Sequence, residues 1–393
     1  MDSIRIAASP VTYIGWGALK NLGDEVERYG NGPVLIIADP VIQSLGLVEK
    51  IAAPLRKTGR QVTVYTDIIP EPLLQTAEEL VRFARQGHYA LVMGIGGGSA
   101  LDMAKLAAVL IRNPGPVKDY LNLTGTKAVT NRGIPKILIP TTAGTGTEVT
   151  NISVVALEQT KDVVVHDHLI ADTAIVDPEL TVTVPPAVTA ATGADALTHA
   201  LEAYLSVNAN PYSDGLALQA IKLTGGSLVA ATEDGTDTRA RTHMMYGSYL
   251  AGLAFFSAGV GAVHALAYPL GGQFHIAHGA SNAVLLPYVL DHIRSSCAGR
   301  LGTILQTLGD DTVYGSEAEA AFKCVRWLKE LMQRIGIPAT LGGYQIPETA
   351  LRSLAEDGIQ QKRLLARCPM SLSHEDVYRI YEKAFRGSFA DQA

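Results

Sequence analysis

The stretch YALVMGIGGGSALDMAKLAAVLIR, residues 89–112, is the part of the sequence that best predicts the fold class. Its first part is an apolar, β-rich run, and its last part has apolar residues at helical spacing. The glycines between them let the backbone approach a ligand closely. The free N–H groups at the start of the helix suit a phosphate. The stretch therefore predicts a strand, a turn and a helix, with Gly97, Gly98 and Ser99 as candidate phosphate contacts.

This glycine turn matches neither of the two common phosphate motifs. Ser99 stands where the fingerprint G-x-G-x-x-G has its last glycine, and the GK[ST] of a P-loop is missing. Taken alone, the turn is as consistent with a tight packing corner as with a phosphate cradle. We expect Asp102 in the first helical turn, where its carboxylate contacts a ligand bound at the glycine turn or simply pairs with the helix dipole.

Strand-like and helix-like segments alternate through the first half of the chain. Residues 33–39, 61–68 and 134–140 have strand-like patterns, and residues 41–59 and 73–87 have helical spacing. Such alternation predicts a parallel sheet wound with helices. Beyond Pro185 and Pro186 the pattern is helical without convincing strands. We therefore expect an α/β domain at residues 1–186 and an all-helical domain at residues 187–393.

A polar loop follows one of the expected strands. The segment PTTAGTGTEVTN, residues 140–151, is rich in threonine hydroxyls, and the candidate contacts in it are Thr141, Thr142, Thr145 and Thr147. Ligands bind at the carboxyl ends of strands in open α/β sheets, so the loop predicts a site for a polar ligand. Asp39 also ends a strand. It is placed to accept a ribose 2′-hydroxyl and to repel a 2′-phosphate, or else it opens an ordinary Asp-Pro turn.

The composition argues against several partners and compartments. The 393 residues carry a formal net charge of −6 and contain no basic run, so we expect neither nucleic acid nor an anionic membrane as a partner. Three scattered cysteines and a first segment without an apolar leader predict a cytoplasmic protein. Residues 242–290 contain no Asp, Glu, Lys or Arg. Glycines, Pro269 and the histidines His264, His275 and His278 interrupt this run, which favours buried core helices over a membrane span.

The uncharged run contains candidate metal ligands. His264 and Tyr268 are four residues apart on an expected helix, and His278 follows after the double glycine Gly271–Gly272. On an earlier helix Asp195 and His199 show the same spacing, which places them on one face. Buried imidazoles need partners for both ring nitrogens. One carboxylate and three imidazoles suit Fe²⁺ or Zn²⁺, so at least two of these histidines are interpreted as metal ligands.

Several segments follow one another along the chain: GIGGGSALDMAK, IPTTAGTGTEVTN, AIVDPELT, TGADALTHALEAYLS, and HALAYPLGG…HG with NAVLLPYV after it. In this order and spacing they resemble the iron-containing (group III) alcohol dehydrogenases over roughly residues 10–385. The resemblance implies a Rossmann-like, dinucleotide-binding α/β domain with a parallel sheet. It further implies an all-helical metal-binding domain after it, and a cleft that holds NAD(P) and the metal.

The resemblance also implies roles for individual residues. The metal ligands correspond to Asp195, His199, His264 and His278. The pyrophosphate loop corresponds to Gly97, Gly98 and Ser99, and the polar loop near the nicotinamide to Thr141, Thr142, Thr145 and Thr147. Lys161 corresponds to a lysine that contacts the cofactor. Asp39 corresponds to the position that usually selects NAD over NADP.

The chain departs from the family pattern at three places. Tyr268 replaces a histidine beside the nicotinamide, Ala277 replaces the proline before the last ligand with His275 nearby, and Glu71 replaces an asparagine. A phenol is a poor base at neutral pH. We therefore hypothesise that His275 relays the alcohol's proton to solvent while Tyr268 shapes the substrate pocket. The alternative is that His275 is only a rim residue.

The resemblance predicts a metal-dependent oxidoreductase that transfers a hydride between NAD(H) and a small alcohol/aldehyde pair. NAD is expected rather than NADP, with Fe²⁺ as the metal and Zn²⁺ as the alternative. The sister activities of maleylacetate reductase and glycerol dehydrogenase, a dehydroquinate synthase-like lyase, and a non-catalytic metal-binding subunit stay open. A homo-oligomer, a dimer or larger, is expected.

Overall fold

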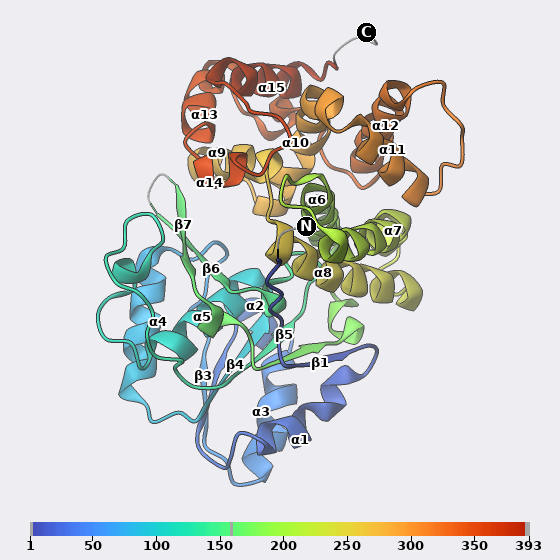
Figure 1. Ribbon diagram of the computed structural model, residues 1–393. Helices are drawn as coiled ribbons and strands as arrows, with labels where there is room; N and C mark the ends of the chain where they lie inside the picture. The colour runs from blue at the N-terminus through green and yellow to red at the C-terminus, as the bar shows by residue number, and fades with distance from the viewer. Residues whose placement is uncertain (1–2, 158–159, 390–393) are drawn as a thin grey trace. The chain divides into compact units, whose positions relative to one another are not determined.

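The computed structural model describes residues 3–157 and 160–389, which form two compact units. The first unit comprises the described residues up to Thr142 together with Gly146–Thr181. The second comprises Ala143–Thr145 and the described residues from Val182 onward. The units thus divide after Thr181, whereas the boundary expected at residue 186 falls on the first residue of helix α6. Figure 1 labels most of the elements named below.

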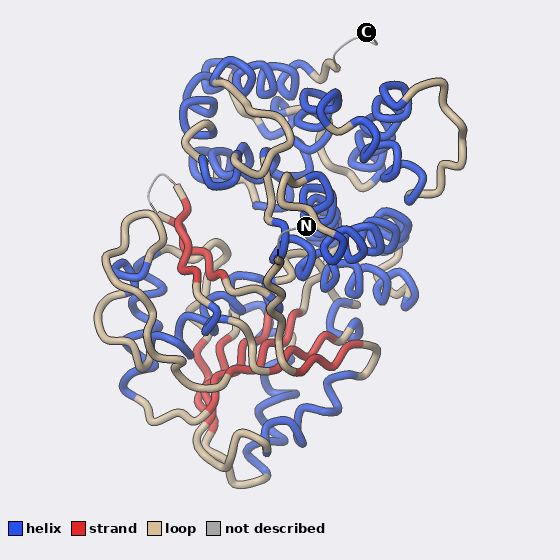
Figure 2. The backbone as a smooth tube through the Cα atoms, viewed as in Figure 1, coloured by secondary structure: helices blue, strands red, loops and turns tan. Residues whose placement is uncertain are grey.

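The first unit contains a six-stranded sheet whose neighbouring strands all run parallel, in the order β1-β8-β5-β4-β2-β3 (Figure 2). The strands are β1 (Val11–Ile14), β2 (Val34–Ile37), β3 (Val62–Tyr65), β4 (Leu91–Gly96), β5 (Lys136–Pro140) and β8 (Thr173–Val176). An antiparallel pair is formed by β6 (Ile152–Ala156) and β7 (Lys161–Val165). The predicted parallel α/β architecture is confirmed.

Helices cover both faces of this sheet. They are α1 (Leu22–Glu27), α2 (Pro40–Ser44), α3 (Leu47–Lys57), α4 (Leu74–Gln86) and α5 (Gly98–Leu110). Successive side chains of a strand point to opposite faces. Accordingly, Leu35 and Ile37 of β2 pack in a hydrophobic cluster with α4 and α5, whereas Val34 and Ile36 pack with α1 and α3. Coverage on both faces explains why the central strands β2 and β4 are continuous apolar runs.

The glycine turn joins β4 to α5 as predicted. Gly96 has φ 146°, and a Cβ there would lie 2.8 Å from Cβ of Ala100, so only glycine fits. The expectation for Asp102 was wrong in one respect. Helix α5 begins at Gly98, and its first turn contains no acidic residue. Asp102 is the fifth residue of the helix, beyond the exposed N–H groups of the first turn.

The second unit is helical, with no strand among its described residues. Its helices are α6 (Pro186–Leu205), α7 (Pro211–Glu233), α8 (Thr238–Ala258), α9 (Ala262–Phe274), α10 (His278–Ile293), α11 (Ala298–Thr307), α12 (Glu317–Arg334), α13 (Leu351–Gly358), α14 (Lys362–Leu365) and α15 (His374–Arg386). Pro186 occupies the first position of α6, where its missing N–H costs no hydrogen bond. The predicted all-helical second part is confirmed for the described residues.

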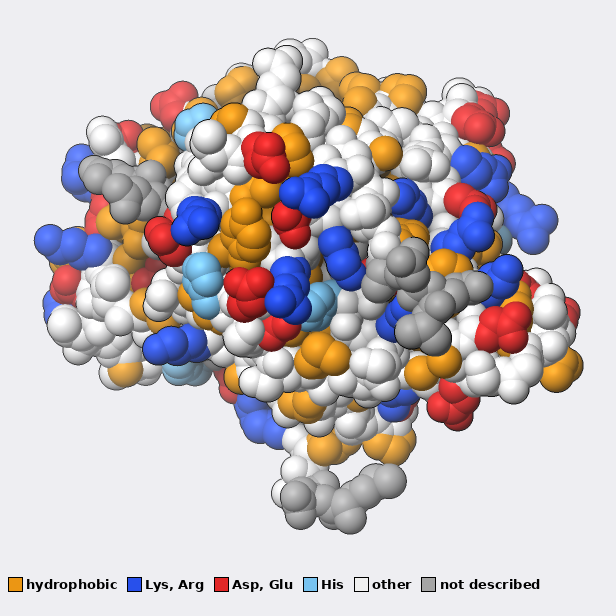
Figure 3. Space-filling model, turned by 90° about the horizontal axis from the view of Figure 1, so that it is seen from above, with side chains coloured by type: hydrophobic (Ala, Val, Ile, Leu, Met, Phe, Trp, Pro, Cys, Tyr) orange, Lys and Arg blue, Asp and Glu red, His pale blue; other side chains and the backbone are white. Residues whose placement is uncertain are grey.

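The uncharged run forms α9 and parts of α8 and α10, and most of its apolar side chains belong to the core of the second unit. Among the described residues, no single helix has both the length and the apolar character needed to cross a membrane. Helices α8 and α9 reach that threshold only as a pair, and their axes differ by 106°. On the face drawn in Figure 3, acidic and basic side chains are interspersed.

Candidate metal centre

Helix α6 presents three polar side chains on one buried face. Asp195, His199 and Glu202 lie at positions i, i+4 and i+7, which a helix of 3.6 residues per turn brings into one row. Each is no more than 6% exposed. Such groups are costly to bury without partners, so this row marks a site with a specific function.

The Glu202 carboxylate fixes the start of α9. It accepts the backbone N–H of Val263 at 2.7 Å and lies 2.5 Å from Nδ1 of His264. Gly261 precedes the helix, and a Cβ there would lie 3.3 Å from Glu202 Oε1, so the chain passes close to this carboxylate. With Nδ1 engaged, the imidazole of His264 directs Nε2 to within 3.7 Å of Asp195 Oδ1. A carboxylate behind a histidine in this way sets the ring orientation of a metal ligand.

Helix α10 begins at His278 and packs closely on α6. A Cβ on Gly279 would lie 2.2 Å from the carbonyl oxygen of Ala191 and 3.3 Å from Cβ of Asp195. Glycine at this position therefore allows the first turn of α10 to touch α6. The contact brings His278 Nε2 to 3.7 Å from Asp195 Oδ1.

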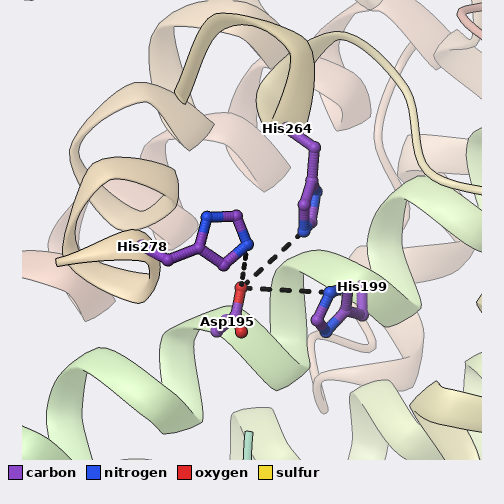
Figure 4. A group of neighbouring side chains, drawn as sticks. All are labelled: Asp195, His199, His264 and His278. Atoms are coloured by element: carbon purple, nitrogen blue, oxygen red, sulfur yellow. Dashed lines mark ion pairs between the residues drawn. The ribbon is translucent and has the colours of Figure 1, made fainter. Parts of the chain in front are cut away.

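These side chains converge on one small volume (Figure 4). One donor atom from each lies within 4.8 Å of every other, and the group, here called the ligand set, is Asp195, His199, His264 and His278. Asp195 Oδ1 is central, since it lies 4.0 Å from His199 Nε2 and 3.7 Å from the other two Nε2 atoms. One carboxylate and three imidazoles at these separations fit a single divalent first-row metal.

The electrostatics of the ligand set favour a cation. Burial lowers the pKa of His199 to about 4, so its imidazole is neutral at pH 7. Burial by itself raises the pKa of Asp195, but the three neighbouring imidazoles and the Asn282 amide outweigh it and the pKa is lowered. The group therefore combines a buried carboxylate anion with a neutral imidazole, the protonation states in which these side chains bind metals.

Asn282, one turn after His278 on α10, brings its amide to the same place. Its Nδ2 lies 2.7 Å from Asp195 Oδ1, 3.2 Å from His264 Nε2 and 3.3 Å from His278 Nε2. The side chain is fully buried. Aromatic rings complete the surroundings, because Phe255 stacks on His199 at a centroid distance of 4.4 Å.

The two candidate proton-transfer residues occupy different positions. The ring of Tyr268 lies 5.9 Å from that of His278, so α9 brings it beside the ligand set. His275 ends α9 in the left-handed conformation with φ 55°, and its side chain is exposed. Its backbone N–H donates to the carbonyl of Gly271.

In the first unit, candidate cofactor contacts gather at the carboxyl ends of β4 and β5. Gly96 and Pro140 are register partners in these neighbouring strands. A Cβ on Gly97 would lie 3.6 Å from Thr142 Oγ1, and the N–H of Thr141 donates to the carbonyl of Gly96. Gly97 and Gly98 are respectively the residue before α5 and its first residue. The glycine turn and the start of the threonine loop are therefore neighbours.

The Pro70–Pro72 turn lies against the same corner. The N–H of Glu71 donates to Ser99 Oγ at 3.1 Å, and the Glu71 carboxylate pairs with Lys161 at 3.0 Å. Glu71 has φ 52°, a conformation that asparagine adopts more readily than glutamate. Lys161 and Ser99 are thus both in contact with one residue, Glu71.

Asp39 and Asp102 both engage their own helices. Asp39 caps α2, where its Oδ1 accepts the N–H groups of Val41 and Ile42 at 2.9 and 3.0 Å. Asp102 is buried and pairs with Lys105 at 3.2 Å. It also accepts the Thr147 hydroxyl at 3.3 Å and the N–H of Val154 at 3.0 Å. Thr145 is half-buried and belongs to the segment counted with the second unit.

Two family profiles match most of the chain. The one described as "Iron-containing alcohol dehydrogenase" matches residues 9–178, and "Fe-containing alcohol dehydrogenase family, C-terminal" matches residues 189–385. The chain belongs to the iron-containing alcohol dehydrogenase family. It is an alcohol dehydrogenase with a His/Asp metal-binding site.

Individual relatives cover nearly the full length. "Long-chain-alcohol dehydrogenase 1" of Geobacillus thermodenitrificans is 59% identical over 391 residues, which is 100% of this chain and 99% of the relative. "NAD-dependent methanol dehydrogenase" of Bacillus methanolicus is 34% identical, with 95% of this chain and 98% of the relative covered. Among solved structures, a 1,3-propanediol oxidoreductase superposes with a TM-score of 0.93 at 31% identity, covering 98% of this chain and 100% of the other.

Two residues of this alcohol dehydrogenase's metal site, Glu202 and Asn282, were not predicted from the sequence. Glu202 continues the helical row of Asp195 and His199, so its spacing could have indicated it. Asn282 follows His278 by four residues, and the same periodicity places both on one face of α10. An asparagine is not a typical ligand of Fe²⁺ or Zn²⁺, which is why metal-ligand spacing did not single it out.

Proposed function

We propose that this alcohol dehydrogenase interconverts an alcohol and its aldehyde with NAD as the hydride carrier and one Fe²⁺ held by the ligand set. Zn²⁺ is the alternative ion. The observation that supports this most strongly is the convergence of one carboxylate and three imidazoles in a buried volume. A bound divalent metal supplies Lewis acidity toward the oxygen of the alcohol or aldehyde.

The residues of the chain have separate tasks in this proposal. Asp195 and the three histidines hold the ion, and Glu202 holds the imidazole of His264 from behind. Tyr268 lies beside His278 and limits the space for the substrate next to the site. His275, exposed at the end of α9, passes the alcohol's proton to solvent.

For the cofactor, we assign the pyrophosphate to Gly97, Gly98 and Ser99 and the nicotinamide side to the threonine loop and Lys161. Backbone N–H groups at the start of α5 support the first assignment. Asp39 supports NAD over NADP, because its carboxylate would meet a 2′-phosphate with like charge. Asp102 accepts the Thr147 hydroxyl, and we assign this pair to the same part of the cofactor site.

For the substrate, the relative with 59% identity carries the name of a long-chain-alcohol dehydrogenase. We therefore extend the small alcohols expected from the sequence to primary alcohols with longer alkyl chains. The protein is proposed to work as a homo-oligomer, a dimer or larger.

The test is an activity assay on purified protein after metal removal and reloading with Fe²⁺ or Zn²⁺. A series of linear primary alcohols from ethanol upward is offered with NAD and with NADP, and NADH formation is followed. Net NADH formation that requires the metal supports the proposal and separates a dehydrogenase from a lyase that uses NAD transiently. Absence of NADH formation with every alcohol and both metals contradicts it.

A further inference from the structure

The amide of Asn282 lies against one side of the ligand set. Three of the four metal-ligand atoms lie within hydrogen-bonding distance of its Nδ2, and we call them the Asn282 face: Asp195 Oδ1, His264 Nε2 and His278 Nε2. Nδ2 donates a hydrogen bond to Asp195 Oδ1 at 2.7 Å, and the two Nε2 atoms lie 3.2 and 3.3 Å away. Each Nε2 has one lone pair, which a bound ion would occupy, so the bond to Asp195 is the one that the amide keeps when the ion is bound. The fourth ligand, His199, is not among the hydrogen-bonding neighbours of this amide.

The orientation of the amide follows from the charge of Asp195. Turning it by 180° would place Oδ1 of Asn282 about where Nδ2 is now, next to the Asp195 carboxylate, and two acceptor oxygens repel each other. The present orientation leaves Oδ1 of Asn282 buried, without a hydrogen-bond partner among the described residues. Such an unsatisfied buried group destabilises the folded state. The fold tolerates this cost and keeps the amide N–H on Asp195 Oδ1.

The side chain also fills the space over the Asn282 face. Asn282 has no solvent-exposed surface, and it stands on α10 with buried neighbours Ser281 and Ala283. An oxygen ligand from solvent or substrate would have to displace the amide to reach an ion through this face. The other sides of the ligand set involve His199.

We propose that Asn282 is a positioning residue that holds the Asp195 carboxylate and closes the Asn282 face. A substrate oxygen then reaches the ion only from a side that includes His199. This inference rests on the proposed function, because it requires a metal at the ligand set.

The test uses Co²⁺ as the probe, because its visible absorption is strong when four ligands coordinate the ion and weak when six do. The full-length protein is compared with Asn282→Ala, which opens the face, and Asn282→Leu, which fills it but cannot donate a hydrogen bond. Asn282→Ser is a second opening variant in case the alanine variant does not fold. Ser281→Ala is the matched control, since Ser281 is buried on the same helix and its hydroxyl bonds the carbonyl of Ile276 instead. Affinity for Co²⁺ is measured by competition with a chelator.

We expect both Asn282→Ala and Asn282→Leu to bind Co²⁺ roughly tenfold more weakly, because each loses the support of Asp195. Only the opening variants should lose absorption intensity, by several-fold, as solvent enters the coordination shell. The inference is overturned if the alanine and serine variants keep the wild-type spectrum and affinity, or if the leucine variant loses intensity as they do. Failure of the wild-type protein to bind Co²⁺ overturns the proposed function, and this inference with it.

Discussion

The Glu202 carboxylate contacts both the side chain and the backbone of His264, 2.5 Å from Nδ1 and 3.4 Å from the backbone nitrogen. It therefore links α6 to the first turn of α9 at the residue that faces the metal site. The helix start and the ring orientation of a ligand depend on one side chain.

The first prediction concerns Glu202. Glu202→Ala should weaken metal affinity roughly 10- to 100-fold, because the imidazole of His264 loses its orienting partner. Glu202→Gln keeps an acceptor for Nδ1, so its loss should be smaller. Chelator competition measures both affinities, and circular dichroism verifies that the variants fold. Equal losses in the two variants, or none in either, would show that the contact does not position the ligand.

A second prediction uses Glu148, which is buried in the first unit. Burial raises its pKa to about 7, against the weaker opposing effects of its own backbone N–H and of Lys105. When folding raises the pKa of a carboxyl group, the unfolded chain ionises that group at a lower pH than the folded chain does, and ionisation therefore stabilises the unfolded state. Its contribution to stability therefore falls as pH rises from about 4.5 to beyond 7, by up to roughly 3 kcal/mol.

Glu148→Gln should remove this pH dependence. The variant should match the wild type near pH 4.5 and gain stability relative to it at pH 8, as measured by urea unfolding. Glu49→Gln, a change at an exposed carboxylate, is the control. If the difference in unfolding free energy between the wild type and Glu148→Gln is the same at pH 4.5 and pH 8, then folding does not raise the pKa of Glu148 and the prediction is wrong.

The third prediction concerns cofactor choice. Like charge between Asp39 and a 2′-phosphate should favour NAD by about 1–3 kcal/mol, or roughly ten- to a hundredfold in affinity. Asp39→Asn keeps the cap of α2 but removes the charge, so it should reduce the preference for NAD over NADP without loss of stability. Asp39→Gly should reduce this preference too. The ratio of kcat/KM for NAD and NADP decides the matter, and comparable wild-type values contradict the prediction.

The fourth prediction concerns the proton route. If His275 relays the alcohol's proton, His275→Gln should lower kcat/KM for alcohol oxidation and change the acidic limb of its pH profile. Tyr268→Phe should change KM among alcohols of different size and leave that limb in place. A His275→Gln variant with the wild-type rate and acidic limb would make His275 a rim residue only.

Local patterns were enough to predict most of the fold. The strand, glycine turn and helix at residues 89–112 follow from residue types that are adjacent in sequence, and the turn requires glycine at Gly96. The position of Asp102 was harder to predict because Gly97, which precedes α5, has no side chain that marks the helix start. Its role in the core depends on Lys105 and Val154, and only tertiary packing brings Val154 to it.

The ligand set was predictable because two of its residues share one helical face and the histidines lie in an uncharged run. Asn282 was not, because its amide meets Asp195 only where α10 packs on α6 at Gly279. The exposure of His275 was equally hidden, since it results from the left-handed end of α9. The contact between Asn282 and Asp195 joins two helices that are far apart in sequence, and a local pattern does not reveal it.

The central claim is that Asp195, His199, His264 and His278 bind one divalent metal. The most direct measurement is the metal content, by elemental analysis, of wild-type protein and His264→Ala after anaerobic loading with Fe²⁺ and removal of free ion. His243→Ala is the control, since that histidine pairs with Ser227 instead. We predict one ion per chain in the wild type and the control, and a large loss of both metal and activity in His264→Ala. Full occupancy in His264→Ala would contradict the claim.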